Sequence, residues 1–386
     1  MPATKNRIGW REKEKRHVGR YTAQTPDGPQ RKSLYSRKGE TKKDLEKRLA
    51  LAMGDAARGF HIDSKNLKVD EWLELWLSNC IKPLVEADKI AYSTYARYRG
   101  IVNKHLSPAL GHRKLKDLTR PEVRRLYADK SKTLSPRTVD YIHVTLQMAL
   151  SQAVWDDLIY RNVAQRARPR SSRHASLDKA KALSATQVRA LLAAARGIRN
   201  EALYAVALHT GLRQGELLGL WWKDLDLEAE SPKLSVRHAL KVTDHGLDFG
   251  PPKNNLSRRS IPLNRTAVAA LRAHRTRQKE ERLAAPEWRD ARLVFPNRVG
   301  GPMDHTNLYG RDYKPLLERA GLADEGFTFH ALRHTFATEL FNQGKRPKII
   351  QTLLGHSSIV QTMDTYSHLL DDMDGDEVGG LDEAFG

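Results

Sequence analysis

A short stretch near the C-terminal end of the chain, residues 328–368, contains the side chains that chemistry on a phosphate requires. His330 and Arg333 are three positions apart, so a helix places both on one face. A guanidinium beside an imidazole suits a phosphate, because Arg offers a planar fork of donors and His can donate a hydrogen bond or move a proton. His356 and Tyr366 follow, and a tyrosine hydroxyl at that position can attack the bound phosphate.

Two other interpretations of this stretch are open on its residues alone. An H-x-x-R pair on a helix is usually solvated, and most tyrosines are structural. His330 and His334 also have the i, i+4 spacing of helical zinc ligands, but that motif needs Glu after the first His, and Ala331 stands there. With no Cys nearby and no evident third ligand, the sequence predicts no metal site. The choice between a solvated pair and a phosphate site depends on the rest of the chain.

Helix signals indicate how the stretch is positioned. Thr328 is expected to cap a first helix, which Gly344 ends. A second helix is expected from Pro347 to Gly355, and Ser358 starts a third. The pattern predicts three short helices: the first carries His330 and Arg333, His356 lies between the second and the third, and the third leads to Tyr366.

The charge of the whole chain favours a nucleic acid partner. Its 386 residues include 66 Lys and Arg but only 46 Asp and Glu, a formal net charge of +20 with a pI near 9.9. Residues 1–65, 66–182 and 183–370 are each net basic, whereas residues 371–386 carry seven acidic and no basic side chains. This distribution predicts several DNA-facing modules followed by an acidic tail.

Other classes of protein are disfavoured by composition. Cys80 is the single cysteine, so neither an intramolecular disulfide nor a thiolate metal cluster can form. The first residues show no signal-peptide pattern, and no apolar run is long enough to cross a membrane. We expect a soluble cytoplasmic protein without a cofactor and without a membrane partner.

Three segments precede the domain that holds the candidate residues. In residues 1–65, alternating strands around Pro26-Asp27-Gly28 and an amphipathic helix ended by Gly59 predict a three-stranded sheet plus a helix. Its basic ribbon fits a DNA groove or is an ordinary charged hairpin. Residues 66–165 read as a helical domain, in which Thr119 and Ser135 open helices, and residues 166–182 read as a basic interdomain linker.

The second compact domain, residues 183–370, is expected to mix helices and strands. Ser184 caps a first helix and Gly211 ends the next. Arg213 and Glu216 follow, and then three strands are predicted in LSVRHALKV, LDFG and RRSIPL. Lys253 lies in the turn between the last two strands. The acidic tail, residues 371–386, is most simply a disordered solubilising end.

The ordered set of motifs resembles one family. TGLRQGELLGL, the Lys253 hairpin before SIPL, HALRHTFAT, LLGHSS and a tyrosine ten residues after His356 are together similar to the tyrosine recombinases, the site-specific DNA integrases. The resemblance covers residues 183–370 and fills all six catalytic positions of the family. It implies these catalytic residues: Arg213, Lys253, His330, Arg333, His356 and the nucleophile Tyr366. It also implies that Glu216 holds a neighbouring group of the site in place.

The resemblance carries further expectations. It implies a multidomain chain, mainly α with small β-sheets (α+β): an arm-type DNA-binding domain in 1–65, a core-binding domain in 66–165 and a mixed α/β catalytic domain in 183–370. The implied activity is strand cleavage and rejoining through a 3′-phosphotyrosyl intermediate, in integration and excision of phage or mobile-element DNA. The implied partners are double-stranded DNA with core-type and arm-type sites, a tetramer of the chain on DNA, a DNA-bending host protein and an excision factor. The expected location is the bacterial cytoplasm, at the nucleoid, and the family's tail often docks on a neighbouring subunit.

The residue types suit this reaction without reference to the family. Arg213 and Arg333 can act as paired forks on the non-bridging oxygens, and His356 can donate a further hydrogen bond. With the two guanidiniums and Lys253 around the phosphate, the reaction needs no metal to balance charge. Because the phosphotyrosine preserves bond energy, it needs no ATP.

The remaining groups would move protons. Lys253 is expected to protonate the 5′-oxygen leaving group. His330 is expected to help remove the phenolic proton of Tyr366, because a phenol with an ordinary pKa near 10 is a weak nucleophile.

Two alternatives from other classes remain on the sequence. A type IB topoisomerase shares the catalytic logic but relaxes supercoils without exchanging partners, and the N-terminal unit and linker argue against it. A DNA-binding regulator that has lost catalysis is disfavoured because every catalytic position is filled. A two-site exchange assay separates the first alternative, and covalent trapping of DNA separates the second.

Overall fold

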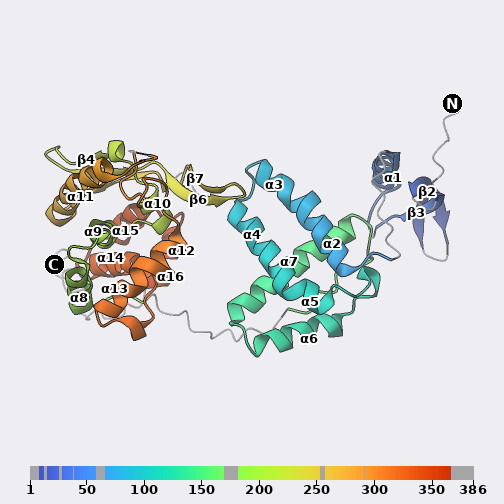
Figure 1. Cartoon of the computed structure of the whole chain (residues 1–386). Coiled ribbons are helices and arrows are strands. Elements are labelled where there is room, and N and C mark those ends of the chain that lie inside the picture. The colour runs from blue at the N-terminus through green and yellow to red at the C-terminus, as the bar shows by residue number, and fades with distance from the viewer. Residues whose placement is uncertain are drawn as a thin grey trace, which may run out of the picture. The chain divides into compact units, whose positions relative to one another are not determined.

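The computed structural model describes residues 8–12, 15–25, 28–37, 39–57, 66–168, 181–252, 257–290 and 292–366. The chain forms two compact units, Met1–Ala175 and Ser176–Gly386. Both are mainly helical with small antiparallel sheets, which confirms the predicted fold class (Figure 1). Pro26, Asp27, Gly59, Lys253 and the acidic tail, together with most of the predicted linker, lie outside the described residues.

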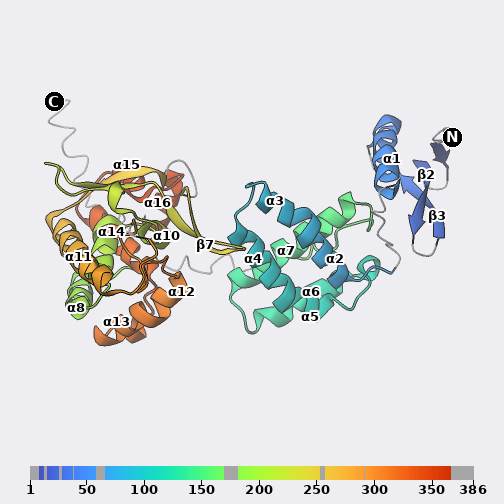
Figure 2. The same ribbon diagram turned by 45° about the horizontal axis from the view of Figure 1, so that its top comes forward.

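The N-terminal part of the first unit is a three-stranded sheet with one helix beside it, as predicted. The antiparallel strands lie in the order β1 (Gly9–Arg11), β2 (Arg16–Thr25) and β3 (Gly28–Tyr35), and α1 (Lys42–Ala57) follows. Figure 2 shows α1 running alongside this sheet. Its buried Leu45 and Leu49 form a small core with Leu34. A Cβ at Gly19 would lie 2.7 Å from Leu49 Cδ2, so glycine allows the close approach of α1 to β2.

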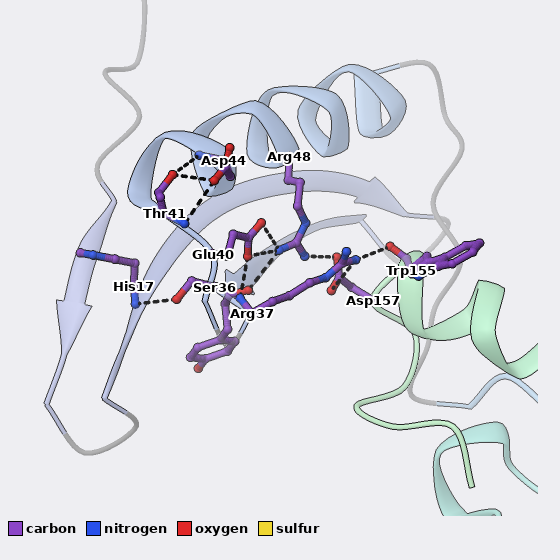
Figure 3. Close-up of polar contacts among 10 residues, drawn as sticks. His17, Ser36, Arg37, Glu40, Thr41, Asp44, Arg48, Trp155 and Asp157 are labelled. Atoms are coloured by element: carbon purple, nitrogen blue, oxygen red, sulfur yellow. Dashed lines mark hydrogen bonds and ion pairs between the residues drawn. The ribbon is translucent and has the colours of Figure 1, made fainter. Parts of the chain in front are cut away.

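The N-terminal sheet and α1 contact the helical part of the same unit through two arginines (Figure 3). Arg48 pairs with Glu40 at 2.6 Å and also with Asp157, which follows the end of α7 (Pro136–Trp155). Arg37 Nη2 donates to the carbonyl oxygen of Trp155 at 2.7 Å. A cation at the C-terminal end of a helix interacts favourably with the helix dipole. Some of the basic residues of this segment therefore make contacts within the chain.

The rest of the first unit is a helical bundle. Its helices are α2 (Val69–Trp76), α3 (Lys82–Glu86), α4 (Tyr92–Ile101), α5 (Ser107–Leu110), α6 (Arg120–Ser131) and α7, with π-helical turns at Leu77–Ile81 and Val102–Leu106. Trp72, Leu73, Trp76 and Leu77 are buried, and Trp72 Nε1 donates to the carbonyl oxygen of Ala149 at 3.0 Å. Thr119 forms the predicted capping box with Glu122, and Ser135 Oγ accepts from Thr138 N at 3.3 Å. Both predicted helix starts are confirmed.

The second unit is organised around a helix that is buried on nearly all sides, α9 (Glu201–Thr210). The other helices are α8 (Ala185–Ala195), α10 (Gln214–Leu218), α11 (Arg265–Ala284), α12 (His305–Asn307), α13 (Lys314–Arg319), α14 (His330–Asn342), α15 (Pro347–Leu354) and α16 (Ile359–Tyr366). Ser184 caps α8 and Gly211 ends α9 in the left-handed conformation, as predicted. A Cβ at Gly211 would lie 2.3 Å from Phe336 of α14, so glycine lets the turn after α9 contact that helix.

The strand prediction for this unit was partly wrong. The stretch LSVRHALKV is two strands, β5 (Lys233–Val236) and β6 (Ala239–Thr243), which lie in different sheets. β5 pairs with β4 (Leu225–Asp226) and β8 (Arg259–Pro262), whereas β6 forms a hairpin with β7 (Gly246–Gly250). Between β5 and β6, the His238 ring stacks on Trp221 with centroids 3.8 Å apart and bonds Asp224 at 3.3 Å. These tertiary contacts redirect the chain, and the local alternation does not reveal them.

The predicted bounds of the C-terminal helices are confirmed with one exception. Gly355 ends α15, and Ser358 Oγ accepts from Val360 N at 3.1 Å at the start of α16. Thr328 does not cap α14 with its side chain, because the helix begins at His330 after Phe329. The carbonyl oxygen of Thr328 instead accepts from Ala331 N at 2.9 Å and from the Tyr313 hydroxyl at 3.3 Å. None of the described helices combines the length and apolarity needed to cross a bilayer.

Candidate active site

Three arginines converge on the C-terminal end of α15. The last carbonyl groups of a helix have no partner within the helix, and Gly355 turns the chain away in the left-handed conformation. Three successive carbonyl oxygens here each accept from a different guanidinium: Leu353 O from Arg259 Nε (2.5 Å), Leu354 O from Arg333 Nη2 (2.7 Å) and Gly355 O from Arg213 Nη2 (2.8 Å). His356 is the next residue. The structure thus brings Arg213, Arg333 and His356 together, as the sequence predicted.

Glu216 is the carboxylate of this cluster. It is 3% exposed, and its Oε1 accepts from Arg213 Nη1 at 2.8 Å. Arg259 binds the same carboxylate, with Nη2 2.9 Å from Oε2. Burial on its own raises the pKa of this carboxyl, but the charges and hydrogen bonds of Arg259 and Arg213 outweigh it and hold the pKa below its ordinary value. Glu216 is therefore ionised and holds the guanidinium of Arg213.

Arg333 is the most deeply buried of the predicted cations. It is 3% exposed, and its Nη1 donates to the carbonyl oxygen of Gly211 at 2.6 Å. Burial, followed by the nearby charge of Arg213, lowers the pKa of this guanidinium to about 9. Arg213 and Arg259 both pair with Glu216, and Arg333 has no carboxylate partner among the described ion pairs, so the cluster carries excess positive charge. Such a cluster attracts an anion.

His356 is held as a neutral hydrogen-bond donor. It is 8% exposed, and its Nδ1 lies 2.8 Å from Thr362 Oγ1. Burial, followed by the charges of Arg333 and Arg213, lowers the pKa of the imidazole to about 3. When Thr362 donates to Nδ1, the neutral ring carries its proton on Nε2. His356 can then donate to an oxygen of the anion that the arginines attract.

The buried state of His356 predicts a loss of stability in acid. Its folded pKa lies below the ordinary value of 6.5, so protonation favours the unfolded chain. Its contribution is complete above pH 6.5 and is lost toward pH 3, by about 1.4 kcal/mol for each pH unit. The unfolding free energy of the second unit, measured by urea unfolding between pH 7 and pH 4, should change less steeply with pH in His356→Gln than in the wild type. His245→Gln, whose side chain is 92% exposed, should keep the wild-type slope. Equal slopes for all three proteins would contradict the assignment.

Tyr366 is buried beside the arginine cluster. It is 2% exposed, and its ring packs on Phe341 with centroids 5.4 Å apart. Its hydroxyl lies 2.7 Å from His334 Nδ1. Burial raises the pKa of the phenol, while the charge of Arg333 acts in the opposite direction. The hydroxyl is thus held on an imidazole near the predicted phosphate site.

The imidazole that contacts the Tyr366 hydroxyl is not the one that the sequence predicted. His330 was expected to accommodate the phenolic proton of Tyr366, but the described partner of that hydroxyl is His334. His330 contacts His334 edge to face, with centroids 4.7 Å apart. Desolvation and neighbouring positive charges, that of His334 first, lower the pKa of His330 to about 4. His334 was considered only as a zinc ligand, although its place one turn after His330 was the available signal.

Lys253 lies outside the described residues, between β7 and β8. Tyr313, another tyrosine of this unit, is fully buried in the main core and packs edge to face on Phe329, with centroids 5.4 Å apart. The described part of the chain contains no group of three or more His, Cys, Asp or Glu placed to hold a metal ion.

Comparison with known proteins agrees with this geometry. Residues 181–373, half of the chain, match the phage integrase family, and residues 68–131 match the phage integrase N-terminal SAM-like domain. The integrase of Streptomyces ambofaciens is 31% identical over 368 residues, covering 93% of this chain and 91% of that protein. A protein described as tyrosine recombinase XerC-like, from Caldanaerobacter subterraneus subsp. tengcongensis, is 27% identical and covers 92% of each chain.

The fold also matches solved structures. The Tn1549 transposon integrase in complex with transposon right end DNA is 24% identical, with a TM-score of 0.64 over 83% of this chain and 99% of that one. The match includes the bundle and the second unit, so both folds are shared with that integrase. The full-length relatives, the family match across the second unit and the motif order agree. The chain therefore belongs to the phage integrase family of tyrosine-type site-specific DNA recombinases.

Proposed function

We propose that this recombinase cleaves DNA with Tyr366 and holds the scissile phosphate on Arg213, Arg333 and His356. The observation that supports this most strongly is the cluster of guanidiniums with one shared carboxylate, beside a neutral buried imidazole and a tyrosine. Fixed donors around a phosphate stabilise the charge that develops on its oxygens in the transition state. The proposed catalytic set is Arg213, Lys253, His330, Arg333, His356 and Tyr366, with Glu216 in support and His334 as the proton acceptor of Tyr366.

The cleavage step follows from these positions. The hydroxyl oxygen of Tyr366 attacks phosphorus, its proton passes to His334, and the bond from phosphorus to the 5′-oxygen breaks. Lys253 gives a proton to the departing 5′-oxygen, which leaves a 3′-phosphotyrosyl bond. A 5′-hydroxyl from a second DNA strand then attacks that bond and releases Tyr366. His330, which contacts His334, lies beside the proton path.

Capture of covalent adducts tests this function. Purified protein is incubated with nicked random genomic fragments, the mixture is denatured, and DNA attached to protein is sequenced. We expect adducts at one short sequence, each joined through Tyr366, and strand exchange when two such duplexes are mixed. Adducts without exchange would favour a topoisomerase. Specific binding without adducts would favour a regulator.

The role of Lys253 predicts a selective rescue. Lys253→Ala should cleave ordinary DNA slowly, because the 5′-oxygen leaves poorly without a proton. A substrate with sulfur in place of the bridging 5′-oxygen should restore the cleavage rate, since a thiolate leaves without protonation. The control is Arg213→Ala, whose defect lies on the non-bridging oxygens and should persist on the sulfur substrate. Failure of the sulfur substrate to rescue Lys253→Ala would remove this residue from the acid role.

The wider assembly is part of the proposal. Residues 66–165 and 183–370 would each bind core-type DNA, and residues 166–182 would be the basic linker between these domains. Residues 1–65 would bind arm-type sites, and a tetramer on DNA would integrate and excise a phage or mobile element, with a DNA-bending host protein and an excision factor. The names of the similar integrases and the match to an integrase in complex with DNA support this assignment.

Deletion of residues 1–65 tests the role of the N-terminal module. The truncated protein should still cleave short core-site DNA, lose most integration and show a weaker salt dependence on long DNA, because it makes fewer phosphate contacts. The contact of Arg48 with Asp157 makes the alternative concrete, namely that the module stabilises the bundle. In that case melting temperature and core cleavage would fall together. Melting, cleavage and integration are therefore measured on one sample.

A further inference from the structure

Arg259 is a buried arginine of the second unit that has no part in the mechanism above. Its side chain, on β8, is 4% exposed. Nε donates to Leu353 O at 2.5 Å, and Nη1 donates to Ser257 O at 2.9 Å. The remaining contacts are to the Glu216 carboxylate, 3.3 Å from Nη1 and 2.9 Å from Nη2. With its donors engaged in this way and its side chain buried, Arg259 is poorly placed to bind a phosphate itself.

The partners of Arg259 are the groups that orient the catalytic side chains. The carboxylate that it binds also accepts from Arg213, at Nη1 (2.8 Å) and at the main-chain N (3.0 Å). The carbonyl that it binds, Leu353 O, belongs to the end of α15, two residues before Gly355. Arg259 therefore joins three parts of the site: the start of α10 with Arg213, the turn that carries His356, and the strand that follows Lys253.

The glycine in this turn shows how closely the parts fit. A Cβ at Gly355 would lie 2.8 Å from Arg259 Nη1 and 3.2 Å from Ser257 Cα. The turn can therefore take its left-handed conformation beside the guanidinium only without a side chain. A shift of Arg259 would open this contact and release the carbonyl of Leu353.

We propose that Arg259 is a positioning residue for DNA cleavage, which acts through Glu216 on Arg213 and through the end of α15 on His356. The inference rests on the proposed function of those residues. A planar fork can bind the carboxylate with two nitrogens while a third donates to the helix end, which the single ammonium group of lysine cannot do. The role requires both the shape and the charge of the side chain.

Charge and shape make separate predictions. Without Arg259, the buried carboxylate of Glu216 loses one of its two cations, so its pKa rises and it becomes protonated at a higher pH. Arg213 then loses its ionised partner below that pH. In Arg259→Met, the acid limb of the cleavage rate should move to higher pH, and the rate at its optimum should fall about 10- to 100-fold, as for other residues that orient a reacting group. Arg259→Lys should restore the acid limb but only part of the rate.

The experiment measures single-turnover formation of the covalent adduct between pH 5 and pH 9, on a nicked duplex with the sequence recovered by adduct capture. The matched control is Arg199→Met, because Arg199 also binds one carboxylate, Glu281 at 2.9 Å, and two carbonyl oxygens, those of Pro296 and Asn297. We expect Arg199→Met to lower melting temperature while keeping the wild-type rate and pH profile. Arg259→Met should lower the cleavage rate less in the Glu216→Gln variant than in the wild-type chain, because Arg259 acts partly through Glu216.

An unchanged rate and pH profile in folded Arg259→Met would overturn the proposal and leave Arg259 a purely stabilising role. Where Arg259→Met does not fold, the cleavage rate of Arg259→Lys decides. A wild-type cleavage rate in Arg259→Lys overturns the proposal. Failure of the wild-type chain to form any adduct would instead contradict the proposed function. Titration with inorganic phosphate, monitored by the NMR resonances of the His356 ring, then tests positioning without cleavage. Arg259→Lys should bind phosphate several-fold more weakly than wild type, and equal affinity overturns the proposal.

Discussion

Tyr366→Phe is expected to form no covalent complex with DNA and to support no recombination. The substitution removes the nucleophilic oxygen and leaves the ring, which keeps its packing on Phe341. DNA affinity should change little, because one hydroxyl adds little to many phosphate contacts. Loss of the hydrogen bond to His334 should lower the unfolding free energy by about 1 kcal/mol. The protein should therefore bind its site and remain folded, but without chemistry.

Denaturing gels and binding assays on the same nicked duplex measure the two properties separately. Tyr313→Phe is the matched control, since Tyr313 is also fully buried and its hydroxyl donates to Thr328 O at 3.3 Å. This variant should be destabilised to a similar extent and should still form the adduct. A phosphotyrosyl adduct in Tyr366→Phe would show that another tyrosine is the nucleophile.

Arg333→Ala should produce the second-largest loss, about 100-fold or more in cleavage rate, by analogy with removal of one donor to a developing oxyanion. It should also be the most destabilising change in the site. The carbonyl oxygens of Gly211 and Leu354 lose their donor in a buried place, which lowers the unfolding free energy by about 2–4 kcal/mol. Arg213→Ala should lose as much cleavage with a smaller loss of stability, because that side chain is 31% exposed.

Thermal melting and single-turnover cleavage of both variants check this difference. Arg333→Lys keeps a charge but cannot reach two carbonyl groups and a phosphate at once, so its cleavage should stay well below wild type. The assignment of Arg333 would be wrong if Arg333→Ala, compared at a temperature where it is folded, cleaved at the wild-type rate.

Local signals accounted for much of the fold. Ser135 and Ser184 cap the helices that their spacing predicted, and Gly211 and Gly355 end helices in the left-handed conformation. These features depend on a few neighbouring residues, which a sequence displays directly. The break between β5 and β6 was missed because it depends on a ring stack between His238 and Trp221, seventeen positions apart. Thr328 failed as a cap for a related reason, since its segment is held by Tyr313.

In the candidate site, too, contacts between nearby positions were easier to predict than contacts between distant ones. Arg213 and Glu216 are three positions apart, so the start of α10 brings them together. Arg259 lies 43 positions from Glu216 and 94 from Leu353, so no local pattern connected it to the site. His334 was visible one turn after His330, but its contact with Tyr366, 32 positions away, depends on how α14 and α16 pack. The motifs therefore identified the chemistry better than the network that orients it.

The cluster of Glu216 and the arginines at the end of α15 also affects how samples of this protein should be compared. The phosphate site that we propose on Arg213 and Arg333 would exist only in the folded chain, where Glu216 and the end of α15 hold the two guanidiniums. An anion that binds the folded chain alone raises the melting temperature by mass action, in proportion to RT ln(1 + [L]/Kd). A preparation in sulfate buffer and one in chloride are thus thermodynamically different samples. Part of any apparent effect of a substitution at Arg213 or Arg333 on melting would be a loss of buffer binding, so such variants should be ranked in a buffer whose anion is monovalent.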